Sequence, residues 1–373
     1  MTGPLSGVTV IELGGLGPAP FAGMTLAGMG ADVTRIDRPG PGSPVPQGNL
    51  TDRGKRSVVL DLKQPEAVAA VLDLAAGADV LIEPFRPGVA ERLGLGPAQA
   101  LARNPALVYG RMTGWGQDGP LALRAGHDIG CIAITGALHA IGPADGPPQI
   151  PLNLLGDYGG GAAYLVMGVL AALVEARATG RGQVVDAAIV DGTVQLLTAM
   201  HALLAQGSWT DRRGANLLDG GTPYYSVYAT RDGKYLAVGA LEPKFYAELV
   251  AVLGLDADPA DQQDRSQWPE LRRKIAAAVA GKTRDEWAEI FAGTDACAAP
   301  VLSLTEAAGH PHLAARGTLT ERDGIMQSGP APRFSAHPDQ QPEPPPARGQ
   351  HTREVLAAIG REHLIGTGHA RQA

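Results

Sequence analysis

Strands and helices alternate along the first third of the chain, and this alternation constrains the fold more than any other feature of the sequence. Short runs rich in Val and Ile predict strands, and the apolar stretches between them have helical spacing. The predicted strands are residues 8–13, 33–37, 57–62, 79–84 and 106–113, with helices at residues 24–29, 65–78 and 89–95. Strands separated by helices pair in parallel, so we expect an α/β fold with a Rossmann-like parallel sheet flanked by helices.

The pattern changes after residue 205 and indicates a second domain. Before that point we expect a helix from about residue 157 to 178, a strand at 183–189 and a helix at 190–204. Residues 206–222 are polar and glycine-rich and predict a linker. Strands at 224–230 and 234–239 then flank the turn signal Asp232-Gly233, and helices follow at 243–253, 268–280 and 284–291. We therefore expect a large α/β domain over residues 1–205, completed by residues 316–373, and a small α+β domain over residues 223–315. In the last part we expect an extended proline-rich segment, 330–346, and a helix at 351–359.

Composition and charge limit the classes of partner. The chain has 45% hydrophobic and 18% charged residues, which is typical of a globular protein. Its net charge of −7 argues against nonspecific binding to nucleic acid or to an anionic membrane. Its two cysteines, Cys131 and Cys297, predict no disulfide framework. The most apolar stretch, residues 161–174, is too short to span a bilayer, and no signal peptide is visible, so we expect a cytoplasmic protein.

The loop after the first strand raises the question of a dinucleotide site. Gly15-Leu16-Gly17-Pro18-Ala19-Pro20 partly matches the GxGxxG fingerprint, and Asp37 ends the second strand where a ribose-binding acid would stand. Pro18 and Pro20 lack the N–H groups that a pyrophosphate would need, which argues against this alternative.

Basic side chains gather at or just beyond the predicted strand ends, where ligands of open α/β sheets bind. In an acidic protein this clustering favours a phosphorylated ligand, although two or three of these cations can be ordinary solvated charges. The set is Arg38, Arg53, Lys55, Arg56, Lys63, Arg86 and Arg92.

Two polar residues precede apolar segments in the middle of the chain: His127, in a glycine-flanked turn, and Asp157, before a run of glycines. Each is predicted to lie at the start of a helix, where free N–H groups and the helix dipole stabilise negative charge. That position suits a base, but an isolated Asp there is more often a helix cap. Cys131 follows His127 by four residues and could form a nucleophile or metal pair with it, although a buried free thiol is the simpler interpretation.

The chain resembles the class III coenzyme A transferase superfamily, and within it the α-methylacyl-CoA racemases. The resemblance extends in order over nearly the whole chain. The segments that carry it are GPLSGVTVIEL, GADVTRIDRPG, the DLK of residues 61–63, DVLIEPFRPGVAERLGLG, YGRMTGWGQDGP, AGHDIG, PLNLLGDYGGG, GRGQVVDAAIVDG, NLLDGGTPYYSVY, AVGALEPKFY and PAPRFS. The chain departs from many relatives at Pro84, where they have Asn or Gly before an aromatic residue of the CoA site.

The resemblance implies a racemase that inverts the α-carbon of 2-methylacyl-CoA thioesters, with His127, Asp157 and Glu242 as its catalytic set. Two acid/base groups on opposite faces of the substrate suit this reaction, and the N–H of Asp128 is a candidate donor to the enolate oxygen. In the transferases of the superfamily the aspartate is instead a covalent nucleophile, so a CoA transferase remains the alternative. A CoA-binding protein without turnover is a third alternative.

The resemblance also implies CoA contacts and an assembly. CoA would arrive as part of the substrate, with no metal and no other cofactor. The contacts expected from the family pattern are Arg38, Leu60, Lys63, Arg86 and Arg92, followed by Lys55 and Arg56. Members form interlocked homodimers, in which Glu242 of one protomer would meet His127 of the other.

Overall fold

The chain divides into two units, each described here by itself. The computed structural model describes residues 3–40, 49–338 and 341–373. The larger unit comprises Met1–Ala137, Pro151–Leu197 and Thr318–Ala373, and the smaller comprises Leu138–Ile150 and Thr198–Gly317. Residues 138–150 and 198–205 thus group with the smaller unit and not with the predicted large domain. One reason is Arg213, whose guanidinium donates to the carbonyls of His139, Pro143 and Gly146.

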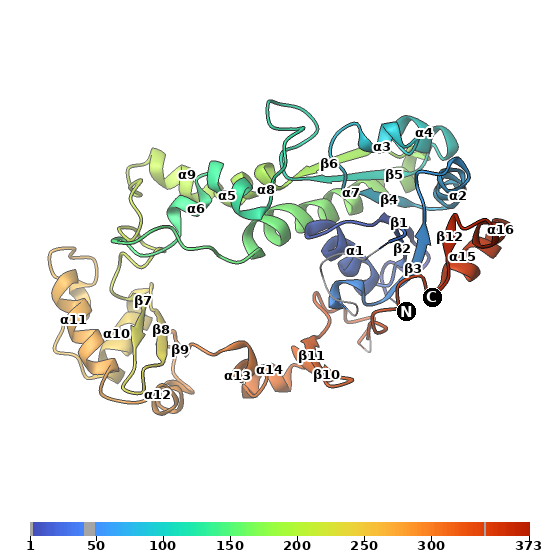
Figure 1. Ribbon diagram of the computed structural model, residues 1–373. Helices are drawn as coiled ribbons and strands as arrows, with labels where there is room; N and C mark the ends of the chain where they lie inside the picture. Colours follow the sequence, from blue (N-terminus) through green and yellow to red (C-terminus); the bar gives the residue numbers. More distant parts are fainter. Residues whose placement is uncertain (1–2, 41–48, 339–340) are drawn as a thin grey trace. The chain divides into compact units, whose positions relative to one another are not determined.

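A seven-stranded sheet forms the centre of the larger unit (Figure 1), in the order β12-β3-β2-β1-β4-β5-β6. Its strands are β1 (Thr9–Leu13), β2 (Asp32–Asp37), β3 (Lys55–Leu60), β4 (Val80–Glu83), β5 (Val108–Thr113), β6 (Val184–Ala188) and β12 (Ala370–Arg371). All neighbours pair in parallel except β12, which runs antiparallel to β3. The parallel sheet predicted from the alternation is confirmed. The strand order reverses between β1 and β4, and ligands of such sheets bind at the carboxyl ends beside this point.

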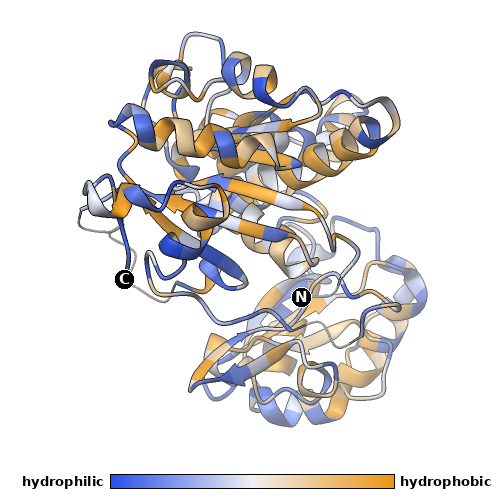
Figure 2. Cartoon of the chain, turned by 90° about the vertical axis from the view of Figure 1, so that its right-hand side faces the viewer, coloured by the Kyte–Doolittle hydropathy of each residue, from blue (hydrophilic) through white to orange (hydrophobic). Residues whose placement is uncertain are grey.

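Helices cover both faces of this sheet because successive strand residues point to opposite sides. Val10 packs with α1 (Pro18–Gly28) and α7 (Ala163–Thr179), whereas Ile11 packs with the helices of the other face. Those helices are α2 (Pro65–Ala76), α4 (Pro97–Arg103), α15 (Thr352–Ala358) and α16 (His363–Gly366). The strands of this sheet are coloured as hydrophobic over much of their length (Figure 2).

Several element boundaries differ from the predictions. The first helix, predicted over residues 24–29, begins earlier, at Pro18. A proline is tolerated at this position because its missing N–H would have no partner in the first turn of a helix. The helix predicted at about residue 157 begins three residues earlier, as the π-helix η2 (Leu154–Ala162), which continues directly into α7. The predicted helix at 190–204 is two helices, α8 (Ile189–Leu196) and α9 (Thr198–Ala205).

The helical stretch from Leu154 to Thr179 is 26 residues, long and apolar enough by length and composition to cross a membrane. The expectation that the apolar stretch is too short for this is therefore wrong. In this structure α7 packs against β5 and β6, and its Leu165 and Val169 are fully buried, so it serves as a core helix.

The smaller unit contains the predicted hairpin and one strand that the sequence did not predict. Strands β7 (Tyr225–Ala229) and β8 (Tyr235–Gly239) pair antiparallel, and β9 (Ala298–Pro300) adds to β8. Helices α10 (Pro243–Leu253), α11 (Trp268–Val279) and α12 (Arg284–Phe291) contribute to its core around Tyr224 and Tyr246.

The C-terminal part returns to the larger unit, where it forms the hairpin β10 (Leu319–Arg322) and β11 (Ile325–Ser328). The proline-rich segment 330–346 has neither helix nor strand in its described residues.

Candidate functional site

A cavity of about 340 Å³ lies at the carboxyl edge of the sheet, beside the point where the strand order reverses. Its walls come from the segments that follow β1, β4 and β5, and from residues 122–127. Loops at this edge are held by the ends of rigid strands, so side chains on them keep fixed positions. His127 and Asp157, which are 30 positions apart in the sequence, both line this cavity.

His127 is the residue that precedes α5 (Asp128–Ile134), with an extended backbone and an exposed side chain. The turn before it packs against an aromatic wall: a Cβ on Gly126 would lie 2.6 Å from Nε1 of Trp115. Only glycine fits this approach, so Trp115 and Gly126 together fix where the histidine emerges into the cavity. The expectation that His127 stands at a helix start is confirmed.

Asp157 lies inside the first turn of η2 and does not cap it. Asn153 is the N-cap residue, and its Nδ2 donates to Oδ2 of Asp157 over 3.3 Å. The alternative that Asp157 is a simple helix cap is therefore wrong. Gly17 faces the same carboxylate, since a Cβ on this glycine would lie 2.7 Å from Oδ2. π-helical turns are rare and occur often at functional sites, because the extra residue redirects a side chain.

The surroundings of Asp157 favour its protonated form. Burial raises the pKa of Asp157 above its ordinary value, and the nearby charge of Asp128 raises it further, whereas the Asn153 hydrogen bond and His127 act in the opposite sense. A carboxyl group that can hold or release a proton in a cavity is suited to acid/base chemistry.

Cys131 is fully buried, and burial raises the pKa of its thiol to about 11. A thiol with such a pKa stays protonated at neutral pH, so a nucleophilic Cys131–His127 pair is not supported. Within the described residues there is also no group of three or more His, Cys, Asp or Glu placed to hold a metal ion.

A second cavity, of about 330 Å³, opens beside the first and is bordered by three basic side chains that do not belong to the core. These are Arg38 after β2, Lys63 after β3 and Arg348 from the C-terminal segment. The two cavities share Leu16 and Phe85 in their walls. An elongated ligand with an anionic end could therefore occupy both.

Asp37, the acid that a dinucleotide ribose would need, is already bound by Arg35. The guanidinium of Arg35 donates three hydrogen bonds of 3.1 to 3.2 Å to the carboxylate of Asp37, which leaves that carboxylate engaged within the protein. Pro18 and Pro20 also lie in the first turn of α1. The geometry gives the dinucleotide alternative no support.

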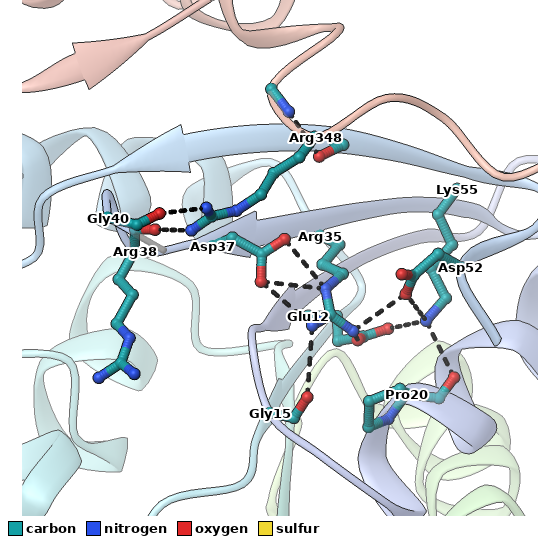
Figure 3. A network of polar contacts seen from close by, with 12 residues as sticks. Glu12, Gly15, Pro20, Arg35, Asp37, Arg38, Gly40, Asp52, Lys55 and Arg348 are labelled. Atoms are coloured by element: carbon teal, nitrogen blue, oxygen red, sulfur yellow. Dashed lines mark hydrogen bonds and ion pairs between the residues drawn. The ribbon is translucent and has the colours of Figure 1, made fainter. Parts of the chain in front are cut away.

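Lys55 is part of a buried ion network beneath the loop between β1 and α1 (Figure 3). Its Nζ donates to Oε2 of Glu12 over 2.6 Å and to the carbonyl of Pro20 over 2.9 Å. Arg35 bonds the same glutamate and the carbonyl of Gly15. The two cations thus hold the loop that carries Gly17. The ammonium group of Lys55 is fully buried, so the prediction that it binds CoA does not fit the structure.

Of the other residues predicted to contact CoA, some lie at the cavities and others do not. Arg86 is exposed in the wall of the first cavity, and Arg92 is exposed at the end of α3 (Val89–Arg92). Arg56 pairs with Asp32 at the opposite, amino edge of the sheet, which separates it from both cavities. The side chain of Leu60 is fully buried in the core.

Arg53 is buried, and its guanidinium donates to Ser328 and Gln327, so it anchors the β10–β11 hairpin. Glu242 precedes α10 in the smaller unit with an exposed side chain that does not cap this helix. Pro84, the departure from the resemblance, lines the first cavity.

Arg348 is a cavity residue that sequence reasoning missed. Its guanidinium donates to the carbonyl of Gly40 over 2.6 Å and to that of Arg38, while the Arg38 side chain points away from it (Figure 3). It lies about 310 positions from these partners and in a proline-rich region, so no local pattern could have indicated it. Trp115 also lines the first cavity, a position that the segment YGRMTGWGQDGP alone does not indicate.

Comparisons with known proteins identify the family of this chain. Residues 5–352 match CoA-transferase family III. The chain is 45% identical to alpha-methylacyl-CoA racemase from Mus musculus, over 95% of this chain and 93% of that protein. It is 44% identical to the Homo sapiens protein of the same name, with the same coverage. Its fold is similar to that of a CAIB/BAIF family protein from Brucella suis, with a TM-score of 0.81 at 26% identity, covering 96% of this chain and all of that one. The chain belongs to CoA-transferase family III.

Proposed function

We propose that this protein is an isomerase that inverts the α-carbon of 2-methylacyl-CoA thioesters. The observation that carries the proposal is that His127 and Asp157, from separate elements, line one cavity at the carboxyl edge of the sheet. The names of the relatives that are 44 and 45% identical support the same reaction.

The proposed reaction moves one proton off the α-carbon and returns one to its opposite face. With one enantiomer, neutral His127 takes the α-proton, the C–H electron pair moves into the thioester as an enolate, and protonated Asp157 donates its proton to the other face of the carbon. With the other enantiomer, ionised Asp157 is the base and protonated His127 is the acid. Two groups are needed because a single base would have to cross the plane of the enolate. Each contributes roughly 10² to 10⁴ in rate.

The enolate oxygen needs a hydrogen-bond donor, and the N–H of Asp128 is proposed for this role. Asp128 is the first residue of α5, where an N–H has no partner within the helix. Such a donor is typically worth about 10² to 10³ in turnover. The proposed reaction uses no metal and no cofactor besides the CoA of the substrate.

CoA is proposed to extend across the two cavities. Its acyl end would lie in the first, beside His127 and Asp157, and its phosphates in the second, beside Arg38 and Lys63. Arg86 and Arg92 are further candidates, since both are exposed and follow β4. Leu60 could offer only its backbone, because its side chain is buried.

Glu242 is proposed to orient the imidazole of His127 in an interlocked homodimer. Its carboxylate is exposed and not used as a cap, so it is available to a second protomer. Exposed apolar side chains on α5 and around the start of η2 also favour association, namely Ile129, Ile134, Leu152 and Leu154.

One incubation tests the reaction. A single enantiomer of a 2-methylacyl-CoA is placed with the enzyme in deuterium oxide, without any acceptor acid. We expect racemisation with deuterium incorporated at the α-carbon. His127→Ala and Asp157→Ala should each lose most of this activity, and wild-type racemisation by both variants would refute the two-base assignment.

The alternative is a CoA transferase in which the carboxylate of Asp157 attacks the thioester carbonyl and displaces CoA as its thiolate, leaving a mixed anhydride. The thiolate then attacks the aspartyl carbonyl of this anhydride, which releases the acyl group as a carboxylate and forms an aspartyl-CoA thioester. This alternative predicts no α-exchange. It predicts instead transfer of CoA to an added carboxylate and inactivation of the substrate-loaded enzyme by hydroxylamine.

A further inference from the structure

The carboxylate of Asp128 lies directly behind Asp157. Its Oδ2 accepts the backbone N–H of Asp157 over 2.6 Å, and its side chain is buried. A Cβ on Gly156 would lie 2.4 Å from the same oxygen, so the π-helix approaches this carboxylate as closely as a glycine allows. The other oxygen, Oδ1, is buried and has no hydrogen-bond partner in the described part of the chain.

A buried carboxylate oxygen without a partner is unfavourable and rare in folded proteins, which calls for an explanation. A capping role would account for the hydrogen bond to Asp157, but an asparagine could fill that role without placing a charge there. What the negative charge adds is repulsion of a second negative charge on Asp157.

We propose that Asp128 is a positioning residue: its carboxylate holds Asp157 through the backbone N–H and, as a neighbouring negative charge, favours the protonated acid. This inference rests on the proposed acid/base role of Asp157 and assigns to the Asp128 side chain a task distinct from that of its N–H. It explains why a second acid lies buried directly behind the cavity residue Asp157.

Among the described residues, the titratable side chains of His127 and Asp128 act on the pKa of Asp157, and they act in opposite directions. Helix α1, which packs against η2, carries no ionisable side chain. The other ionisable groups on elements that pack against η2 are Cys131 on α5, Tyr164, Glu175 and Arg177 on α7, Asp191 on α8, Tyr109 and Arg111 on β5, and Asp186 on β6.

The test separates the hydrogen bond from the charge. Asp128→Asn keeps an acceptor for the Asp157 N–H and removes the charge, whereas Asp128→Ala removes both. The pKa of Asp157 is read directly by carbon-13 NMR of enzyme labelled at the aspartate carboxyl groups, with the signal assigned by its absence in Asp157→Asn. In Asp128→Asn we expect this pKa to fall, because the neighbouring negative charge that raises it has been removed.

The pH profile of racemisation supplies a second readout. We expect the acid limb of kcat/KM to move to lower pH in Asp128→Asn by about the same amount, because that limb reports protonation of the His127–Asp157 pair. The equilibrium constant between the two substrate epimers does not depend on the enzyme, so kcat/KM must change by the same factor in both directions. Asp128→Ala should lose in addition roughly 10² in kcat, because the Asp157 backbone is no longer held.

Asp191→Asn, an acid-to-amide change at an exposed position of α8, is the matched control and should leave both readouts unchanged. Asp128→Glu keeps the charge and should keep the acid limb, which also covers the case in which Asp128→Asn folds poorly. Folded Asp128→Asn with an unshifted carboxyl signal and an unshifted acid limb would overturn the inference. The NMR titration needs no turnover, so it still gives an answer if Asp157→Asn remains fully active and the proposed function fails.

Discussion

Gly17→Ala should separate catalytic geometry from stability, because the glycine is required for two reasons at once. Its φ of 67° with ψ of −115° is a conformation that L side chains rarely adopt, and a substitution there should destabilise the fold by about 1–3 kcal/mol. Its Cβ would lie 2.7 Å from Oδ2 of Asp157, whereas ordinary contact begins at 3.4 Å. The carboxylate must therefore move by about 0.7 Å, the difference between these distances, and a misplacement of about 1 Å can reduce the rate about 10²-fold.

Gly7→Ala provides the matched control. Gly7 also has a positive φ, of 84°, but nothing lies within 4 Å of its added Cβ. Urea unfolding should show comparable losses of stability in the two variants, and α-proton exchange in deuterium oxide should be reduced only in Gly17→Ala. Equal exchange rates in the two folded variants would show that the contact between Gly17 and Asp157 does not set the reactive geometry.

Three further changes test other parts of the structure. Lys55→Met leaves Glu12 buried with one cation fewer and should lower the free energy of unfolding, measured by urea titration, by about 3–5 kcal/mol. The double variant with Glu12→Gln should recover part of this loss, because the buried negative charge is also removed. Asp157→Asn should raise Tm at neutral pH. The folded-state pKa of Asp157 is raised, so its protonated carboxyl contributes fully to the stability of the wild type below the unfolded-state pKa. This contribution is lost as pH rises through the folded-state pKa. The difference in Tm between wild type and Asp157→Asn should therefore vanish in acid. Arg348→Gln should raise KM for an acyl-CoA about tenfold and leave KM for the corresponding acyl-pantetheine unaffected. The exposed control Arg353→Gln should change neither KM value. An equal effect of Arg348→Gln on both substrates would show that Arg348 does not bind the nucleotide end of CoA.

The fold followed largely from periodicity. The Val- and Ile-rich strands and the helices between them were readable because each depends on neighbouring residues, and right-handed crossovers leave few ways to arrange such a series. The two-residue β12 and three-residue β9 were not predicted, since such short strands carry no pattern of their own and exist only through their partners. The π-helix likewise arises from packing of its glycines against α8, where a Cβ on Gly160 would lie 2.4 Å from Thr193 Oγ1.

The sequence by itself determined the sheet, its helical layers and, through a series of motifs, the family with His127 and Asp157 as candidate residues. Tertiary structure decided which charged side chains are available to a ligand. Lys55 and Arg348 are both basic residues, and the neighbouring sequence does not distinguish them. Lys55 is fully buried against Glu12, whereas Arg348 borders a cavity. Burial and ion pairing depend on residues far apart in the chain, and that is why spacing along the sequence could not distinguish them.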